Sequence, residues 1–276
     1  MMEQRLGIVP QERVDGSPYR LIEGDWSRGV FVLCDHAENT IPASHGTLGL
    51  RPEDLNRHIA YDLGAAEVAE RLAALLGVPA LLTRFSRLLI DPNRGLDDPT
   101  LVMQVSDGIV VPGNARLSER EIEARIAGYY APYHRAIELA IETATEAGKA
   151  PVLVSVHSFT QAWKSALRPW HAAVLWDKDP RFAIPLIAAL EALPEVTVGN
   201  NEPYTGKLKG DTLYRHGTLR GLAHALIEIR QDLILGPEGQ AEWAERLATI
   251  LERLLTRPDL SSRLHAVEHF GSETDF

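Results

Sequence analysis

The sequence predicts an α/β fold built on a parallel sheet, and three stretches of the chain support this prediction. Residues 30–34 form an apolar run typical of a buried strand, and the polar residues Asp35 and His36 follow it directly. The same pattern, an apolar run that ends in titratable side chains, recurs at 151–160 and 223–232. Open α/β sheets bind ligands at the carboxyl ends of their strands. We therefore expect the three strand ends to meet at one site.

A strand–helix–strand unit supports the parallel arrangement. Residues 62–76 have an apolar stripe at helical spacing, and Gly77 suits the position just past the end of a helix. Strands are predicted at 78–85 and 88–90, after this helix. An alternation of strand, helix and strand is typical of parallel α/β sheets.

The second half of the chain continues the alternation. Ser118 followed by Glu121 is a capping-box pattern, which predicts a helix over 118–147 that Gly128 and Pro132 divide or kink. Further elements are expected as strands at 172–176 and 196–198 and helices at 180–193, 212–216 and 238–255.

We expect a single domain over residues 1–276, because no Ser/Gly/Pro-rich linker divides the chain. Turn signals make residues 1–25 an irregular N-terminal segment. The turn-rich stretch 95–114 is open to two interpretations, a lid over a site or a solvated surface excursion.

Composition restricts the classes of function. The 276 residues have a formal net charge of −10, which argues against non-specific binding to nucleic acid or to anionic membranes. It does not exclude a small anionic substrate, since a few arginines can make the electrostatic potential positive locally.

The single cysteine, Cys34, lies in an apolar run and is more typical of a core residue than of a nucleophile. Without a possible internal disulfide or a visible signal peptide, we expect a cytoplasmic protein.

Two histidines are the strongest candidates for metal ligands. His36 and His157 each follow or end an apolar strand, and imidazole suits zinc and its neighbours. A third ligand should be a carboxylate. Asp62, at the start of the first strong helix, is preferred, although an acid at a helix N-terminus is also favoured by the helix dipole. Glu38, two residues after His36, is the rival.

Glu228 is the candidate catalytic base. In a buried strand, Ile227 and Ile229 would face one side of the sheet while Glu228 and Arg230 face the other. A glutamate near an activated water can accept its proton and pass it to a leaving nitrogen. An ion pair between Glu228 and Arg230 at the edge of the sheet is the alternative.

Arginines gather around the expected strand ends. Arginine binds carboxylates through a rigid two-pronged fork. Any one of them could instead pair with an acid of the protein, and Arg94 near Asp91 is the clearest case. Their clustering nevertheless suggests a pocket for an anionic substrate. The candidate substrate-binding residues are Arg87, Arg94, Arg168 and Arg230.

Six motifs of the chain together resemble the N-formylglutamate amidohydrolase family. They are Asp-His-Ala-Glu-Asn at 35–39, His-Ile-Ala-Tyr-Asp-Leu-Gly-Ala at 58–65, Ser-Arg-Leu-Leu-Ile-Asp-Pro-Asn-Arg at 86–94, Ser-Val-His-Ser-Phe-Thr at 155–160, Arg-Pro-Trp-His at 168–171 and Ile-Glu-Ile-Arg-Gln-Asp at 227–232.

The resemblance implies a three-layer α/β/α sandwich with a mostly parallel central sheet, similar to zinc-dependent exopeptidases and amidases. It implies zinc held by His36, Asp62 and His157, with Glu228 serving catalysis. The implied reaction is hydrolysis of N-formyl-L-glutamate to formate and glutamate, a step of histidine degradation. The acid Glu38 beside the first histidine disfavours a dicarboxylate unless it binds metal or pairs with an arginine.

We therefore expect a metal-dependent hydrolase of a linear amide in a small N-acyl amino acid. Two other functions stay open. One is a peptidoglycan or peptide amidase on the same fold, and the other is a non-catalytic protein that binds an anionic metabolite.

Overall fold

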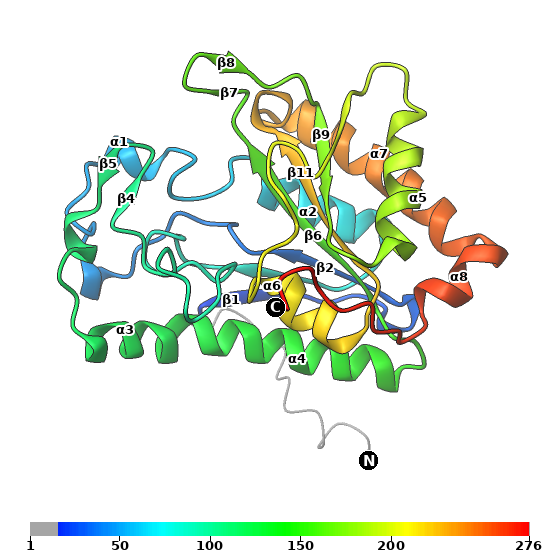
Figure 1. Ribbon diagram of the computed structural model, residues 1–276, viewed down its shortest axis with the longest axis horizontal. Coiled ribbons are helices and arrows are strands. Elements are labelled where there is room, and N and C mark those ends of the chain that lie inside the picture. The colour runs from blue at the N-terminus through cyan, green and yellow to red at the C-terminus, as the bar shows by residue number, and fades with distance from the viewer. Residues whose placement is uncertain (1–15, 276) are drawn as a thin grey trace.

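The computed structural model describes residues 16–275, and a seven-stranded mixed sheet forms its centre (Figure 1). Strands β3, β2, β6 and β11 run parallel to one another. At the two edges, β1 is antiparallel to β3, β9 is antiparallel to β11, and β10 is parallel to β9. In spatial order the strands are β1 (Tyr19–Ile22), β3 (Ala80–Thr83), β2 (Val30–Cys34), β6 (Val152–Phe159), β11 (His224–Arg230), β9 (Ala172–Leu175) and β10 (Val198–Asn200).

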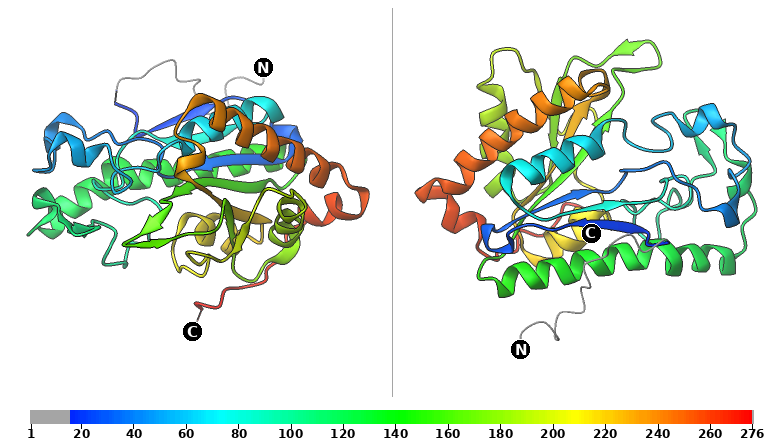
Figure 2. Two further views of the ribbon diagram at one scale, coloured as in Figure 1. Left: turned by 90° about the horizontal axis from the view of Figure 1, so that it is seen from above. Right: turned by 180° about the vertical axis from the view of Figure 1, so that it is seen from behind.

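Helices cover both faces of the sheet, which makes the expected three-layer α/β/α sandwich. The orange helix α7 and the green helix α4 lie on opposite sides of the strands (Figure 2). One face packs against α2 (Ala65–Leu76), α5 (Pro180–Glu191), α7 (Pro237–Thr256) and α8 (Pro258–Leu264). The other face packs against α4 (Ala131–Glu146) and α6 (Thr212–His216). The α/β class and its mostly parallel sheet are thus confirmed.

Alternation along the strands assigns side chains to the two cores. In β6, Val154 and Val156 belong to the core under α2 and α7, whereas Leu153 belongs to the core under α4. His157 is next in the alternation and therefore lies on the α4 face of the sheet. Within the described part of the chain, no helix is both long and apolar enough to cross a bilayer.

The remaining elements are short and lie mostly outside the sandwich. They are α1 (Pro52–Leu55), α3 (Glu119–Arg125), the π-helical turn Ile126–Tyr130, the hairpins β4 (Val105–Ser106) with β5 (Ile109–Val110) and β7 (Ala162–Trp163) with β8 (Ala166–Leu167), and the 3-10 turns Trp26–Arg28, Ala43–His45, Pro112–Asn114, Thr218–Arg220 and Gln231–Leu233.

The capping box that begins the long helical segment is confirmed. Ser118 accepts a hydrogen bond from the backbone N–H of Glu121, whose carboxylate accepts one in return. The π-helical turn at 126–130, which contains Gly128, divides the segment into α3 and α4 as expected. Pro132 follows this turn by two residues, inside continuous helical backbone, and its missing N–H removes one backbone hydrogen bond there.

Three sequence expectations were wrong. Residues 88–90 form a turn rather than a strand, because the Asn114 amide and the Arg125 guanidinium donate to the backbone carbonyls that a strand partner would otherwise use. Residues 1–25 were expected to be irregular; residues 1–15 lie outside the described residues, and the rest contains β1, which pairs with β3 at the edge of the sheet. The first strong helix begins at Ala65, so Asp62 lies before it, since Gly64 takes a positive φ of 78° at the N-cap.

Candidate active site

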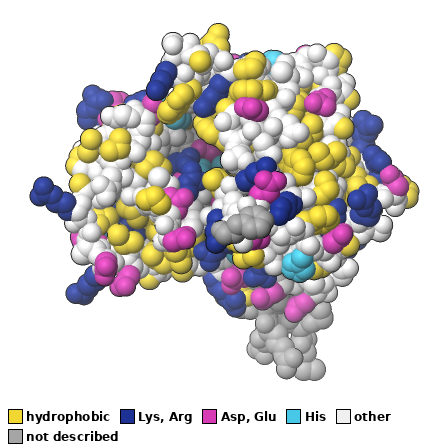
Figure 3. Space-filling model, viewed as in Figure 1, with side chains coloured by type: hydrophobic (Ala, Val, Ile, Leu, Met, Phe, Trp, Pro, Cys, Tyr) yellow, Lys and Arg dark blue, Asp and Glu magenta, His cyan; other side chains and the backbone are white. Residues whose placement is uncertain are grey.

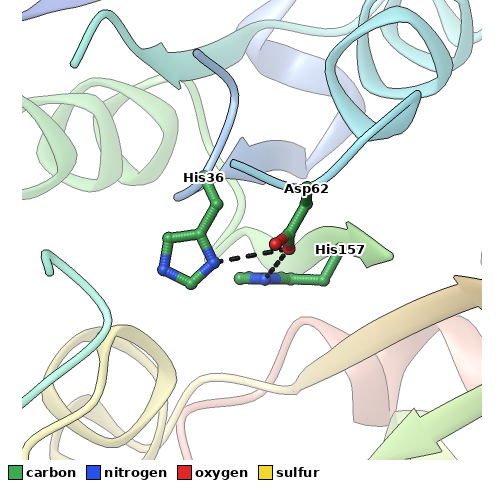
Figure 4. Close-up of side chains that lie close together, drawn as sticks. All are labelled: His36, Asp62 and His157. Atoms are coloured by element: carbon green, nitrogen blue, oxygen red, sulfur yellow. Dashed lines mark hydrogen bonds and ion pairs between the residues drawn. The ribbon is translucent and has the colours of Figure 1, made fainter. Parts of the chain in front are cut away.

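Three side chains from separate segments converge beyond the end of β2 (Figure 4). His36 follows β2, His157 lies in β6, and Asp62 precedes α2. One carboxylate oxygen of Asp62 lies 3.3 Å from His36 Nδ1 and 2.9 Å from His157 Nδ1. The potential ligand atoms of the three residues all lie within 4.8 Å of one another. The structure thus brings together the three residues that the sequence proposed as metal ligands.

Backbone contacts hold Asp62 in this position. Its N–H donates to the carbonyl of His36 at 2.9 Å. The hydroxyl of Ser158, the residue after His157, donates to the carbonyl of Leu63 at 2.9 Å. The segment before α2 is therefore fixed to both β2 and β6, and all three candidate ligands are buried.

Both imidazoles contact a second carboxylate through their other nitrogen. His36 Nε2 lies 2.8 Å from Asp91 Oδ1, and His157 Nε2 lies 3.1 Å from Asp35 Oδ2. Each Nε2–H can donate to its carboxylate, which leaves both Nδ1 lone pairs on the side of Asp62. The His36 Nδ1 atom also lies 3.2 Å from a guanidinium nitrogen of Arg87, which can donate to it. Histidines that bind metal typically have such a carboxylate partner. The donor set of two imidazoles and a carboxylate fits a divalent metal such as zinc.

A polar network orients the Asp35 carboxylate. Its two oxygens accept hydrogen bonds from Tyr133 Oη at 2.9 Å, Thr212 Oγ1 at 2.8 Å and Ser155 Oγ at 3.1 Å. Burial alone would raise the pKa of Asp35, but the hydrogen bond and the charge of His157 outweigh it and lower the pKa to about 2. The carboxylate therefore stays ionised and holds the imidazole in one orientation.

Asp91 has an equivalent role on the other side of the cluster. Its second oxygen accepts from Arg87 at 2.8 Å, and its first also accepts the backbone N–H of Asn93 at 2.9 Å. Although burial opposes ionisation, the charges of Arg87 and His36 hold the pKa of Asp91 well below its usual range. Asp91 therefore pairs with Arg87, and the sequence expectation that Arg94 would be its partner was wrong.

The electrostatics of the cluster favour a bound cation. Burial by itself would lower the pKa of His157, yet the hydrogen bonds to Asp35 and Asp62 raise it to about 10. The pKa of Asp62 is lowered, because the charges of His36 and His157 outweigh its burial. The buried carboxylates thus stabilise positive charge between the two imidazoles, where a divalent metal could replace a proton.

Glu228 lies beside this cluster and has an unusual environment. In the parallel pair β6–β11 it is in register with His157. Its Oε2 is buried and has no hydrogen-bond partner among the described residues. Burial and the negative charge of Asp62 raise the pKa of Glu228 to about 7, against the opposing effect of His157. A carboxylate poised near neutral pH next to potential metal ligands is suited to general-base catalysis.

The alternative ion pair between Glu228 and Arg230 does not form. Arg230 instead pairs with Asp232, with Nε to Oδ1 at 2.7 Å, and donates to the carbonyl of Trp170. Ile227 and Ile229 belong to the core on the opposite face of the sheet from Glu228, as the alternation predicted.

The cluster forms part of a cavity of about 660 Å³. Figure 3 shows the surface hollowed there, with basic and histidine side chains inside the hollow. Arg87 and Arg94 line the cavity. The Arg94 side chain donates to Thr100 Oγ1 at 3.2 Å and to the carbonyl of Asn93 at 2.7 Å, but it pairs with no carboxylate among the described residues. Arg94 is therefore available to an anionic ligand.

Two of the four candidate arginines do not line the cavity. The guanidinium of Arg168 packs over the ring of Tyr204 at 4.9 Å and hydrogen-bonds Thr160. Arg230 is held by Asp232, as described above. The expectation that these two arginines contact the substrate directly is therefore not carried forward, because local partners direct both side chains elsewhere.

Two open questions about nearby segments have structural answers. Glu38 is partly exposed, accepts a hydrogen bond from Thr40 at 3.1 Å and does not line the cavity, so Asp62 is the carboxylate that lies with the two histidines. The stretch 95–114 contributes Met103 and Asp107 to the wall of the cavity. It is therefore more than a solvated excursion.

The sequence analysis did not recognise the residues that orient the two histidines. These are Asp35, Asp91, Ser155, Tyr133 and Thr212. A signal existed for two of them. Asp35 immediately precedes His36 at the end of a buried strand, and Ser155 lies two positions before His157, on the same face of an otherwise apolar strand.

Comparisons with known proteins identify the family of the chain. The family model described as N-formylglutamate amidohydrolase matches residues 28–235. Among curated protein sequences, none matches the chain significantly.

Two solved structures resemble the chain over most of its length. A gene product of Agrobacterium tumefaciens is 34% identical, with a TM-score of 0.81, and the match covers 86% of this chain and 94% of that one. The N-formylglutamate amidohydrolase of Ralstonia eutropha is 24% identical, with a TM-score of 0.68 and coverage of 86% and 96%, which shows the same fold. The chain therefore belongs to the N-formylglutamate amidohydrolase family and is an amidohydrolase.

Proposed function

We propose that the protein is a metal-dependent hydrolase that cleaves the linear amide bond of a small N-acyl amino acid. One observation supports this above all others. Glu228, whose buried Oε2 has no hydrogen-bond partner among the described residues, lies beside a buried His–Asp–His cluster whose histidines each have a second carboxylate partner.

The residues His36, Asp62 and His157 would hold the metal, through both Nδ1 atoms and a carboxylate oxygen. A divalent metal such as zinc supplies Lewis acidity and activates water near neutral pH when it is bound by such donors. Asp91 and Asp35 keep the imidazole Nε2 atoms protonated and the rings fixed. The ligands are therefore preorganised before any substrate enters.

Glu228 performs the proton transfers in this proposal. As a carboxylate with an unpartnered oxygen, it accepts the proton of the attacking water. It then donates that proton to the amide nitrogen, so that the amine departs as a neutral group. Its raised pKa, about 7, suits both the base and the acid role at neutral pH.

Arg94 positions the substrate by binding the carboxylate of its amino-acid part. A guanidinium that pairs with no carboxylate among the described residues can form a two-pronged pair with an incoming one. Arg87 pairs with Asp91 at 2.8 Å and lies 3.6 Å from Asp62, so it keeps both acids ionised and oriented. Arg87 also contacts His36 Nδ1 at 3.2 Å, and a bound metal would replace that contact.

N-formyl-L-glutamate is the reference substrate, because the reaction that names the family converts it to formate and glutamate. The test is formate release by purified protein, measured before and after chelation and after zinc is restored. Release that chelation removes and zinc restores supports the proposal. If chelation leaves turnover unchanged, metal dependence is excluded, and if no N-acyl amino acid is cleaved, the proposed substrate class is excluded.

The proposal includes a cytoplasmic location and a role in histidine degradation. The first is supported by a single cysteine, Cys34, that is buried and unpaired. The second is supported only by the reaction that names the family. Cell fractionation and growth on histidine after gene deletion test these two points separately.

A further inference from the structure

The cavity continues past the catalytic side chains along an apolar wall. We define the apolar wall by three leucines that line the cavity, Leu175, Leu213 and Leu226. Leu226 lies two residues before Glu228 in β11, on the same face of the strand, and it pairs with Leu175 of β9. Leu213 comes from α6. The wall therefore begins next to the catalytic carboxylate and joins the core under α4 and α6.

The cavity is large for the reference substrate. At about 660 Å³ it lies within the range of about 300–1,000 Å³ found for pockets that hold drug-sized ligands. N-formyl-L-glutamate is a much smaller molecule, and both of its ends are polar. It would leave the apolar wall in contact with water or with a carboxylate, and neither gains from that contact.

The charges that line the cavity suit one carboxylate better than two. Among the described lining residues, Arg87 and Arg94 are the only lysines or arginines, and Arg87 is already paired with Asp91. A second substrate carboxylate would find no further unpaired lysine or arginine among these lining residues, whereas the acid Asp177 also lines the cavity. An unpaired carboxylate in such surroundings is costly to desolvate.

We infer that the preferred substrates are N-acyl amino acids with a single carboxylate and a bulky apolar group, which binds against the apolar wall. The inference rests on the proposed amidohydrolase function. Arg94 holds the carboxylate, the amide lies between the His–Asp–His cluster and Glu228, and the apolar group lies along Leu175, Leu213 and Leu226. That group belongs either to the acyl part or to the amino-acid side chain.

Binding to the Glu228→Gln protein in the presence of zinc tests this inference without relying on turnover. Titration calorimetry compares N-formyl-L-glutamate with N-formyl-L-phenylalanine and N-(phenylacetyl)glycine. At least one aromatic compound should bind about tenfold or more tightly than N-formyl-L-glutamate, and which one does identifies the group that meets the wall. The substitution removes a negative charge, so it biases the test against this result. Equal or tighter binding of N-formyl-L-glutamate would overturn the inference.

A substitution in the wall links the preference to these residues. Leu175→Phe narrows the cavity, so the ratio of kcat/KM for the better aromatic substrate to that for N-formyl-L-glutamate should fall about tenfold. The matched control is Leu219→Phe, at an exposed leucine that does not line the cavity, which should leave this ratio unchanged. If Leu175→Phe does not fold, Leu213→Phe serves the same purpose. An unchanged ratio in a folded wall variant contradicts the inference.

The two proposals can fail independently. If the aromatic compounds bind more tightly and no amide is hydrolysed, the catalytic proposal fails and the assigned substrate class stands. If N-formyl-L-glutamate is hydrolysed and is also the tightest ligand, the catalytic proposal stands and the inference about the apolar wall is wrong.

Discussion

Replacing Glu228 by glutamine should separate catalysis from metal binding. The substitution keeps the shape of the side chain and removes its capacity to accept a proton. General acid–base catalysis typically contributes about 10²–10⁴-fold, so we expect kcat to fall by that factor. The histidines and Asp62 are untouched, so the metal content should stay at the wild-type level.

The same substitution should stabilise the metal-free protein. The pKa of Glu228 is raised from 4.5 to about 7, chiefly by burial. Below pH 4.5 the carboxyl is protonated in both the folded and the unfolded states. As the pH rises to about 7 the unfolded state ionises first, so the folded protein loses roughly 3 kcal/mol of stability across this window. Glutamine does not ionise, so the variant does not lose stability at this position as the pH rises.

The assay combines steady-state kinetics, metal analysis and denaturant unfolding of chelated protein at pH 5 and pH 8. The variant should exceed the wild type in unfolding free energy at pH 8 by roughly 3 kcal/mol, and by much less at pH 5. Glu38→Gln is the control, because Glu38 is partly exposed and only accepts a hydrogen bond from Thr40. Normal turnover in Glu228→Gln would refute the catalytic role, and a pH-independent stability difference would refute the account of its environment.

Three further substitutions test the rest of the site. His157→Ala should abolish tight metal binding and activity together, and a metal-loaded, active variant would remove it from the ligand set. Asp91→Asn should weaken metal affinity about 10–100-fold, because His36 loses the carboxylate that orients it; wild-type affinity in a competition assay with a chelator would show that this contact is dispensable. Arg94→Gln should lower kcat/KM about tenfold to a hundredfold for substrates with a free carboxylate. This factor corresponds to a loss of roughly 1.5–3 kcal/mol of transition-state stabilisation. The substitution should have little effect on the carboxamide analogues of these substrates, and an equal loss for both would contradict carboxylate binding.

The main site residues could be predicted because the end of a buried strand can be recognised in the sequence, where an apolar run gives way to polar residues. His36 follows a continuous apolar run, and His157 ends another, so both were expected at one edge of a parallel sheet. Glu228 was found through alternation within a third apolar run. These patterns arise from the order of apolar and polar residues within one short segment, which a single sequence is enough to show.

Contacts between distant segments could not be predicted in the same way. The pairing of Asp91 with His36 spans 55 positions, and the pairing of Asp35 with Thr212 spans 177. Nothing in the local pattern distinguishes these acids from capping or turn residues. Arg230 shows the converse, because its partner is an acid only two positions away, Asp232, whereas the sequence suggested a substrate carboxylate or Glu228.

The sheet was predicted more completely in its centre than at its edges. The strands β2, β6 and β11 are long or fully apolar, and each was expected. The edge strand β1 has four residues with no strict alternation of burial, so its pairing depends on β3 rather than on its own sequence. The antiparallel insertion of β9 beside β11 is likewise a property of the assembled sheet.

The most direct test of this account is the metal content of protein purified without chelators, with formate release from N-formyl-L-glutamate measured on the same sample. If His36, Asp62 and His157 form a metal site, about one divalent metal should be present per chain, and release should depend on it. Protein that stays metal-free after reconstitution with zinc, or that releases formate equally well without metal, would contradict the account.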